Sequence, residues 1–396
     1  MMILIGSLAL GLTFWLAAFA WNLRNNWSVP RVSGQMEFPL RQHPRVSILI
    51  PARNEAKILL QTLPAFLMQD YDNYEVILVD DASTDGTAEV AEQCAHLYPG
   101  KLRVIPVTNL PSDWIGKIHA LHLAFQSACG EWVLATDADI LFHPKALSAG
   151  LWLAEQQQAE LVSIYAFLEC SSFWEKVILP GFGLLLATVF PLRKINDPNS
   201  TVALASGGYI LMRRRVWDRL GGYESIRTEM IDDLNTARIV KHSSHRIFAT
   251  VTKDLVRTRM YHNLVEIWEG LRKNAFAGHR YSVARLLVVV TSSLLCNLLP
   301  LLCLAYFGWE LAGQGKLVEE ANVVLTLSLA QLLLAILLYV PVLFFYEIDL
   351  EYAFLAPVGP IIYACICLDS MARTLFGRGV TWKLRHYGRP PAASES

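Results

Sequence analysis

Long apolar runs at both ends of the chain constrain its fold more than any other feature. Residues 1–21, 286–307 and 323–345 are each apolar over enough length to cross a bilayer as a helix. The chain of 396 residues is 54% hydrophobic and only 17% charged. Soluble proteins carry roughly 25% charged residues, so the composition agrees with the apolar runs. The sequence therefore predicts a protein with several transmembrane helices.

The first apolar run is expected to remain as an anchor and not to be removed as a signal peptide. Residues 18–20 (Ala-Phe-Ala) imitate a cleavage site, but no basic residue precedes the run, whereas Arg24 and Arg31 follow it. Because basic flanking residues stay in the cytoplasm, the next segment is predicted on the cytoplasmic face of the inner membrane. We expect a transmembrane anchor at residues 1–23 and a linker at residues 24–44.

The C-terminal part of the chain is predicted to be a multi-pass membrane region, but one segment leaves its topology open. Residues 353–368 are apolar but short, and they contain Pro357 and Pro360. If this segment crosses, the basic tail lies outside; if it re-enters, the tail stays in the cytoplasm, as the positive-inside rule favours. Residues 177–192 are also apolar but too short to span, so we expect an interfacial or re-entrant segment. The predicted membrane region is 283–376, and the basic tail is 377–396.

Between residues 45 and 256, short β-rich runs alternate with helical stretches. This alternation predicts an α/β fold with a mainly parallel sheet that helices cover on both faces. Ligands of such sheets bind beyond the carboxyl ends of the strands. The predicted strands are residues 46–50, 75–79, 102–107 and 132–136, and the predicted helices are residues 56–69, 86–97 and 117–128.

Polar residues follow three of these strands where each strand ends, so they should converge on one edge of the sheet. Asp80 stands where α/β nucleotide sites commonly present an acid to the ribose or base. Lys117, at the start of a predicted helix, could face a phosphate, although a surface lysine is an equal alternative. The candidate residues are Pro51, Arg53 and Glu55 after the first strand, Asp80 and Asp81 after the second, and Asp137 and Asp139 after the fourth.

The turn that holds Asp137 and Asp139 is the candidate metal site. Two carboxylates this close repel each other unless a cation lies between them. Mg²⁺ usually takes one or two carboxylates and completes its shell with substrate phosphates and water. Taken alone, an Asp-x-Asp turn is more often only a solvated turn. We also expect Pro144 to begin the helix that follows, and Asp85 and Thr87 to be helix caps.

Two further charged segments lie later in the chain. Asp232 and Asp233 begin a predicted helix, where a pair of acids is ordinarily only a complement to the helix dipole. The segment 263–282 carries Arg272 and Lys273 between apolar residues. It is predicted to be an amphipathic interfacial helix on an anionic leaflet.

Composition also excludes some classes of function. The net charge is −1, and no basic stripe with interleaved aromatic residues occurs outside the membrane-flanking segments, so nucleic acid is not expected as a partner. The seven cysteines form no Cys-x-x-Cys pair, and no histidine pair has zinc spacing. They are expected to be reduced packing residues.

Six motifs follow one another along the chain: VSILIPARNE (46–55), VILVDDASTDGT (76–87), IGKIHAL (115–121), ATDAD (135–139), ASGGYILMRR (205–214) and IDDL (231–234). In this order and at these intervals they resemble a family 2 glycosyltransferase of GT-A fold. The resemblance covers about residues 45–262. The segment 257–261 (RTRMY) and the terminal 379–387 resemble the hopene-associated branch of that family, although Leu384 replaces an expected glycine.

The resemblance implies a role for each matching residue. Asp233, the second acid of its pair with Asp232, would be the catalytic base. Asp139, with Asp137, would hold Mg²⁺ or Mn²⁺ on the diphosphate of a nucleotide sugar. Asp80 or Asp81 would contact the nucleoside. Beyond the resemblance, we expect further site residues. They are Pro51, Arg53, Glu55, Lys117, Asp137 and Arg259 for the donor, and Gly207, Gly208 and Trp268 for the acceptor.

One departure from the family pattern narrows the expected reaction. Processive members carry Gln-x-x-Arg-Trp after the base, whereas this chain has residues 256–260 (VRTRM), which lack the tryptophan. We therefore expect one sugar, from a UDP-sugar or a related donor, to be added to a membrane lipid such as a hopanoid or another polyprenoid. The alternatives are a processive polysaccharide synthase and a membrane scaffold that keeps the fold without catalysis.

Overall fold

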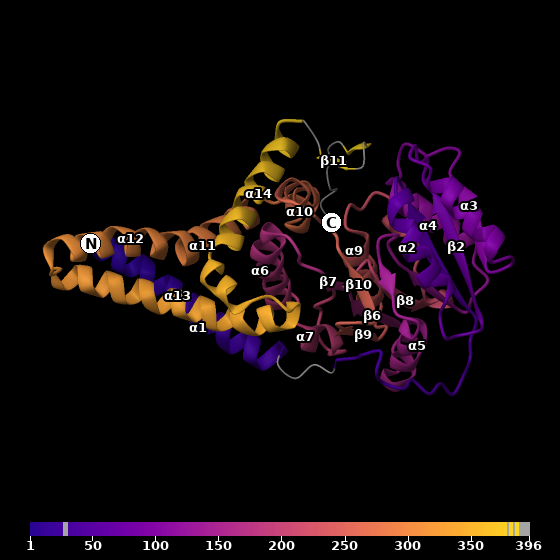
Figure 1. The fold of residues 1–396 in the computed structure, drawn as a ribbon, viewed down its shortest axis with the longest axis horizontal. Coiled ribbons are helices and arrows are strands. Elements are labelled where there is room, and N and C mark those ends of the chain that lie inside the picture. The colour runs from indigo at the N-terminus through magenta and orange to yellow at the C-terminus, as the bar shows by residue number, and fades with distance from the viewer. Residues whose placement is uncertain (27–30, 378–379, 383–384, 388–396) are drawn as a thin grey trace. The chain divides into compact units, whose positions relative to one another are not determined.

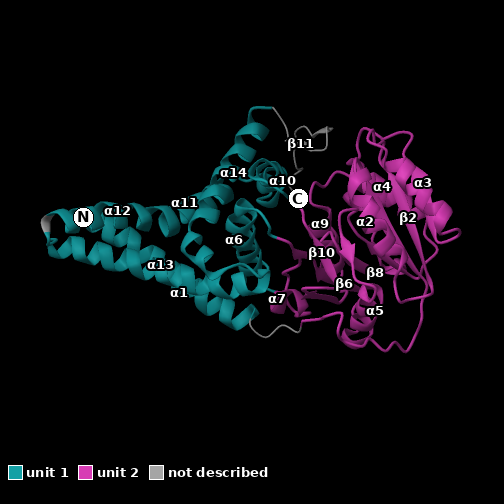
Figure 2. Cartoon of the chain, viewed as in Figure 1, with its two compact units in different colours: residues 1–27, 170–191, 261–396 teal, residues 28–169, 192–260 magenta. Residues whose placement is uncertain are grey.

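The computed structural model describes residues 1–26, 31–377, 380–382 and 385–387. The chain forms two compact units, each assembled from separate stretches of sequence (Figure 2). The sheet unit consists of Ser28–Glu169 and Leu192–Met260. The helical unit consists of Met1–Trp27, Cys170–Pro191 and Tyr261–Ser396. The predicted domain at 45–262 therefore lacks one internal stretch, 170–191, which belongs to the helical unit.

A seven-stranded sheet in the order β3-β2-β1-β4-β8-β6-β9 forms the centre of the sheet unit (Figure 1). Neighbouring strands from β3 to β4 are parallel, as are β6 and β9, whereas β8 runs antiparallel to both β4 and β6. The expected mainly parallel α/β sheet is therefore confirmed. Its strands are β1 (Val46–Ala52), β2 (Tyr74–Asp80), β3 (Leu102–Pro106), β4 (Trp132–Ala135), β6 (Leu161–Tyr165), β8 (Ile210–Arg213) and β9 (Ile247–Val251).

Both faces of the sheet are buried, which explains why β1 and β2 are almost continuously apolar. Ile48 and Leu78 join a core cluster with side chains of α2, α3 and α5. Leu49 and Ile77 point to the other face and are also fully buried, and α4 packs against β1 and β2. The helices and 3₁₀ turn of this unit are α2 (Ala56–Leu67), α3 (Thr87–Leu97), α4 (Gly116–Ser127), α5 (Ala146–Gln157), α7 (Leu192–Asn196), α8 (Arg214–Arg219), η1 (Gly222–Ile226) and α9 (Asp232–His242).

The predicted boundaries of α2, α3 and α4 are correct to within two residues, but Pro144 does not begin α5. The helix starts at Ala146, whose N–H donates to the His143 carbonyl at 2.9 Å. Pro144 therefore occupies the second position of a tight turn that leads into the helix, a position that its fixed φ also suits.

A smaller sheet in the order β5-β10-β7 lies within the same unit. Its strands are short: β5 (Leu141–Phe142), β7 (Phe167–Leu168) and β10 (Val256–Thr258). Arg257 pairs with Glu169 at 3.0 Å. Arg259 follows the last residue of β10, so the small sheet fixes the start of the segment that carries this candidate donor residue.

Among its described residues, the helical unit contains four helices that are long and apolar enough to cross a membrane: Met2–Asn26, Val283–Gly313, Glu319–Tyr346 and Val358–Leu375. These helices indicate association with a membrane. The elements of the unit are α1 (Met2–Asn26), α6 (Phe173–Val189), α10 (Leu264–Gly278), α11 (Val283–Ser293), the π-helix η2 (Leu294–Leu298), α12 (Leu299–Gln314), α13 (Glu319–Tyr346), η3 (Leu350–Leu355), α14 (Val358–Leu375), β11 (Val380–Trp382) and β12 (Arg385–Tyr387).

The third C-terminal helix lies later in the sequence than expected. The predicted segment began at residue 353, but Leu350–Leu355 forms a 3₁₀ turn and α14 begins only at Val358. Pro357 is its N-cap and Pro360 lies in its first turn, where no intrahelical N–H partner is needed. Whether this helix crosses or re-enters stays a prediction. The tail residues 378–379, 383–384 and 388–396 lie outside the described residues.

The stretch predicted as interfacial or re-entrant forms α6. Ser172 and Glu175 make a capping box at its start, and Val177 and Ile178 are buried among side chains of α10 and α14. In α10, the Arg272 side chain is buried and pairs with Asp369 at 3.2 Å. The expectation that Arg272 faces lipid head groups is therefore wrong, because an internal carboxylate neutralises it.

Candidate functional site

The loops that follow β1 and β2 interlock at the carboxyl edge of the sheet. The Arg53 guanidinium donates to the carbonyls of Asp81 at 2.5 Å and Ala82 at 3.1 Å. The Asn54 N–H donates to the Ser83 hydroxyl at 2.9 Å. Asn54 and Ala82 both adopt positive φ, 53° and 52°. Pro51, the next-to-last residue of β1, and Arg53 thus belong to a rigid edge.

Asp85 and Thr87 fasten this edge to two helices, but neither is an N-cap, because Glu55 holds that position in α2 and Gly86 holds it in α3. The Asp85 carboxylate accepts hydrogen bonds from the N–H of Ala56, the first residue of α2, and of Thr87, the first residue of α3, each at 3.1 Å. The Thr87 hydroxyl accepts the Glu55 N–H at 2.8 Å. Burial raises the pKa of Asp85, but the hydrogen bonds from Thr87 and Ala56 outweigh it and lower the pKa below its usual value.

Asp80 and Asp81 are both buried at the end of β2, only 6% and 3% exposed. The Asp80 carboxylate receives the Ser83 N–H, with both oxygens 3.4 Å away. The Asp81 N–H donates to the Ala52 carbonyl at 2.8 Å, which continues the pairing of β1 and β2. The structure brings both residues to the predicted edge, and their role toward a nucleoside stays a prediction.

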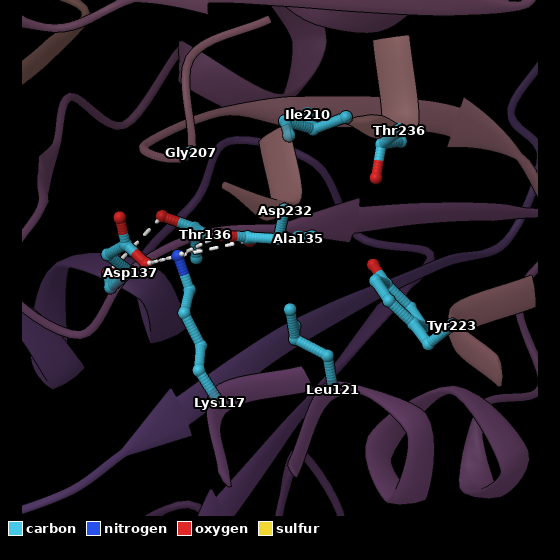
Figure 3. Close-up of a pocket in the computed structure, with 10 residues that line it drawn as sticks. All are labelled: Lys117, Leu121, Ala135, Thr136, Asp137, Gly207, Ile210, Tyr223, Asp232 and Thr236. Atoms are coloured by element: carbon cyan, nitrogen blue, oxygen red, sulfur yellow. Dashed lines mark hydrogen bonds and ion pairs between the residues drawn. The ribbon is translucent and has the colours of Figure 1, made fainter. Parts of the chain in front are cut away.

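Lys117 lies at the centre of an ion cluster that joins three elements (Figure 3). Its Nζ lies 2.7 Å from Asp137 Oδ1 and 3.1 Å from Asp232 Oδ2. Lys117 belongs to the first turn of α4, Asp137 follows β4, and Asp232 begins α9. Burial alone would lower the pKa of Lys117, but Asp137 and Asp232 raise it well above its usual value. The amine is therefore a permanent cation, a property that suits phosphate binding.

Asp233 is a carboxylate of this site whose pKa is raised above its usual value. Its Oδ2 accepts the Gly207 N–H at 3.2 Å, and its Oδ1 accepts the Leu234 N–H at 2.7 Å. Burial and the charge of Asp232 raise the pKa of Asp233 to about 6, although Lys117 and the Leu234 N–H oppose this effect. A carboxylate with this pKa is well matched to proton abstraction near neutral pH.

The raised pKa predicts a pH dependence for any reaction in which Asp233 removes a proton. Only the ionised carboxylate is a base, so the rate should fall as pH decreases through about 6 and level off above it. The single-turnover rate at saturating substrates, measured between about pH 5 and 8, tests this point. A rate that does not change through this range would contradict the assignment.

Gly207 occupies the middle of the cluster. A Cβ at this position would lie 3.1 Å from Asp137 Oδ2, 3.5 Å from Lys117 Nζ and 3.6 Å from Asp233 Oδ2. Gly208 is explained by packing, because its Cβ would lie 2.9 Å from the Ile140 side chain. The absence of a side chain at Gly207 keeps the approach to three charged groups open.

Asp139 lies two residues after Asp137, in the turn that the sequence predicted. Within the described residues, no three His, Cys, Asp or Glu side chains gather in a way that could hold a metal ion. The two carboxylates suit a hard cation that takes most of its oxygen ligands from a bound diphosphate and water. They do not suit a metal that the protein encloses by itself.

Arg259 and Trp268 are the remaining predicted site residues, and the pocket also contains residues that the sequence did not predict. Arg259 belongs to the sheet unit, whereas Trp268 belongs to the helical unit, where its Nε1 donates to Asp369 at 2.8 Å. Tyr223 and Thr236 line the same pocket as Lys117 and Asp232, together with Leu121, Ala135, Thr136, Asp137, Gly207 and Ile210. The sequence patterns did not predict Tyr223, Thr236 or Thr136 as site residues. The one available signal was a threonine, Thr236, among the apolar residues that α9 buries.

Part of the chain matches a known protein family. Residues 47–221, less than half of the chain, match the model of the family described as Glycosyl transferase family 2. The match supports the expected enzyme class, and the GT-A fold is confirmed. Lys117 and Asp137 lie within the matched residues, whereas Asp232 follows them at the start of α9.

Several known proteins are similar to the chain. The Bacillus subtilis protein EpsE, which is named as a glycosyltransferase, is 29% identical over 203 residues. These residues are 48% of this chain and 65% of that protein. The 4,4'-diaponeurosporenoate glycosyltransferase of Staphylococcus aureus is 28% identical over 243 residues, 60% of this chain and 62% of that protein. The chain thus spans less than two thirds of either relative.

Among solved structures, the mannosyltransferase PcManGT of Pyrobaculum calidifontis, in complex with GDP-Man and Mn²⁺, is similar over 90% of this chain and 96% of that one. The sequence identity is 22% and the TM-score is 0.49.

Proposed function

We propose that this enzyme transfers one sugar from a nucleotide-sugar donor to a lipid acceptor in a membrane, with inversion at the anomeric carbon. The observation that carries the proposal is the placement of Asp233. Its carboxylate, with a raised pKa, accepts the Gly207 N–H beside a permanent cation and the candidate metal turn. A base and a diphosphate-binding cation on either side of one glycine suit a single displacement.

The donor would bind through its diphosphate. Asp137 and Asp139 would hold Mg²⁺ or Mn²⁺, and that ion would neutralise charge on the leaving diphosphate. Lys117 pairs with Asp137 and Asp232, and its side chain is 34% exposed, so its ammonium could also reach a phosphate that binds at this edge. The loops fixed by Arg53 and Asp85, with Asp80 and Asp81, would receive the nucleoside, for which UDP is the first choice.

The acceptor hydroxyl would approach from the side of Asp233. As the acceptor oxygen attacks the anomeric carbon, its proton passes to the Asp233 carboxylate and the nucleoside diphosphate leaves on the opposite face. One displacement of this kind inverts the anomeric configuration. The Gly207 N–H holds the base in place, so that reorganisation during the step is small.

A lipid acceptor is supported by the four apolar helices of the same chain. The relative from S. aureus is named for diaponeurosporenoate, a carotenoid, and this also favours an apolar acceptor. A hopanoid or another polyprenoid is the first candidate. The sequence after α9 lacks the tryptophan of processive enzymes, so a single sugar is expected. Arg24 and Arg31, which follow the first apolar helix, favour a domain on the cytoplasmic face of the inner membrane.

Transfer of a radiolabelled sugar by the full chain in native membranes tests the proposal. The label should appear in the organic phase after extraction, as a lipid that carries one sugar. Polymer in the aqueous phase would instead indicate a processive synthase, and absence of turnover with every UDP- and GDP-sugar would indicate a scaffold. Membranes that contain the Asp233→Asn chain are the matched control, because the protein is present but the base is not.

A further inference from the structure

Tyr223 is a buried polar side chain whose hydroxyl finds no hydrogen-bonding partner among the residues that the structure describes. The residue is only 2% exposed. Its ring packs against Trp217 and Phe125 with centroids 5.5 and 5.7 Å away, so apolar packing alone would suit phenylalanine equally well. Buried hydroxyls are nearly always paired, because a hydroxyl without a partner is unfavourable. The oxygen of Tyr223 therefore points to a group that comes from outside the chain.

The surroundings of this hydroxyl form a small recess beside the ion cluster. Tyr223 and Thr236 line the recess with Leu121, Ile210 and Asp232. The two hydroxyl oxygens point toward each other from η1 and α9 (Figure 3). Thr236 stands one turn after Asp232 on the same face of α9. Two hydroxyls opposite two aliphatic side chains form a binding position for one polar group that can both donate and accept a hydrogen bond.

Gly207 links the recess to the ion cluster, because it lines the recess and lies beside three charged groups. Asp137, Lys117 and Asp233 each have an oxygen or nitrogen atom within 3.6 Å of a Cβ built at Gly207. A sugar linked to a diphosphate at Lys117 and Asp137, and attacked by an acceptor at Asp233, would lie against Gly207. Such a sugar would present one edge to Tyr223 and Thr236.

We propose that Tyr223 and Thr236 bind one hydroxyl of the donor sugar and so help to select which sugar is transferred. The inference rests on the proposed function and adds to it a pair of residues that determine specificity. A site that pairs with a substrate hydroxyl discriminates strongly against a sugar that lacks it, because its own buried groups are then left unpaired. The proposal gives neither residue a part in proton transfer, which it leaves to Asp233.

The test compares Tyr223→Phe and Thr236→Val with the unaltered full chain in detergent. Binding is measured in Mn²⁺ for UDP, GDP, UDP-glucose, UDP-N-acetylglucosamine and GDP-mannose. For the nucleotide sugar that binds, each variant should weaken affinity by roughly 3- to 10-fold, whereas the bare nucleoside diphosphate should change by less than about twofold. A donor that lacks the recognised hydroxyl should bind the unaltered chain about as weakly as the complete donor binds Tyr223→Phe. The affinity of that donor should not fall further in Tyr223→Phe.

Thermal unfolding without ligand gives a second readout, in which Tyr223→Phe should not weaken the protein although it weakens sugar binding. Because the Tyr223 hydroxyl lacks a partner in the protein, Tyr223→Phe should leave Tm unchanged or raise it. Tyr74→Phe is the matched control at the amino end of β2. Its hydroxyl donates to the Leu67 carbonyl at 2.6 Å and accepts the Gln69 N–H at 3.1 Å, so this variant should lower Tm and leave sugar affinity intact.

Three results would overturn the inference. Unchanged affinity for the nucleotide sugar in both variants would mean that the recess holds only water. If the variants weakened the binding of the nucleoside diphosphate and of the nucleotide sugar equally, the two residues would act on the nucleotide and not on the sugar. If the unaltered chain binds UDP or GDP but none of the nucleotide sugars, the proposed function itself fails, and the inference falls with it.

Discussion

Asp233→Asn should lower the rate of sugar transfer by roughly 10²- to 10⁴-fold, the usual contribution of a general base. The affinity for the nucleotide sugar and for Mn²⁺ should stay close to that of the unaltered chain. The reason is that proton removal takes place only in the transition state, whereas the donor binds before it. Asparagine retains the acceptor oxygen for the Gly207 N–H, so the local structure should persist.

Asp232→Asn is the matched comparison, because it changes the neighbouring residue of the same helix. Successive helical side chains point about 100° apart, so the two acids face different groups. Asp232 faces Lys117 at 3.1 Å, whereas Asp233 faces the Gly207 N–H. Asp232→Asn should therefore cost less in turnover than Asp233→Asn.

Single-turnover rates at saturating donor, together with direct binding of the donor, separate the two roles. If the losses in rate were reversed between the two variants, the assignment of the base would be wrong. The same holds if Asp233→Asn bound the donor poorly but turned over normally once the donor was saturating.

Asp139→Asn should abolish the metal-dependent part of nucleotide binding while the domain stays folded. A nucleoside diphosphate at a hundred times its Kd should stabilise the unaltered chain by about 2.7 kcal/mol. The part of this gain that requires Mn²⁺ should vanish in the variant, because a neutral amide in place of a carboxylate is a weak ligand for a hard cation.

Thermal shifts with UDP or GDP, with and without Mn²⁺, measure this effect independently of turnover. Asp72→Asn is a suitable control, since Asp72 is an exposed acid just before the amino end of β2, away from the carboxyl edge. It should keep the full Mn²⁺-dependent shift. Retention of that shift in Asp139→Asn would remove this carboxylate from the metal site.

Local patterns in the sequence determined the sheet and the edge on which the chemistry lies. Strands β1, β2 and β4 are short apolar runs between helical stretches, and burial on both faces makes such runs continuous. Once the strands are parallel, their carboxyl ends share one edge. The positions of Asp80 and Asp137 then follow from sequence order alone.

Which groups pair at that edge was decided only by tertiary structure. Lys117 and Asp232 are 115 residues apart, yet they form an ion pair because α4 and α9 both begin at the same edge. The proposal that Asp233 is the base came from a resemblance, and the structure added the Gly207 N–H that bonds to its carboxylate. Tyr223 belongs to a turn without periodicity, so no pattern could place its hydroxyl next to Thr236.

In the helical unit, Arg272 is a second residue whose partner the sequence pattern did not determine. On a helix with an apolar face, a cation that anchors to lipid and a cation that pairs internally give the same sequence pattern. Its partner, Asp369, lies 97 residues further along the chain. A periodic pattern records only which side of a helix is apolar. The partner of a charged side chain is set by the packing of a second helix, because ion pairs act over a few ångströms in space and not along the sequence.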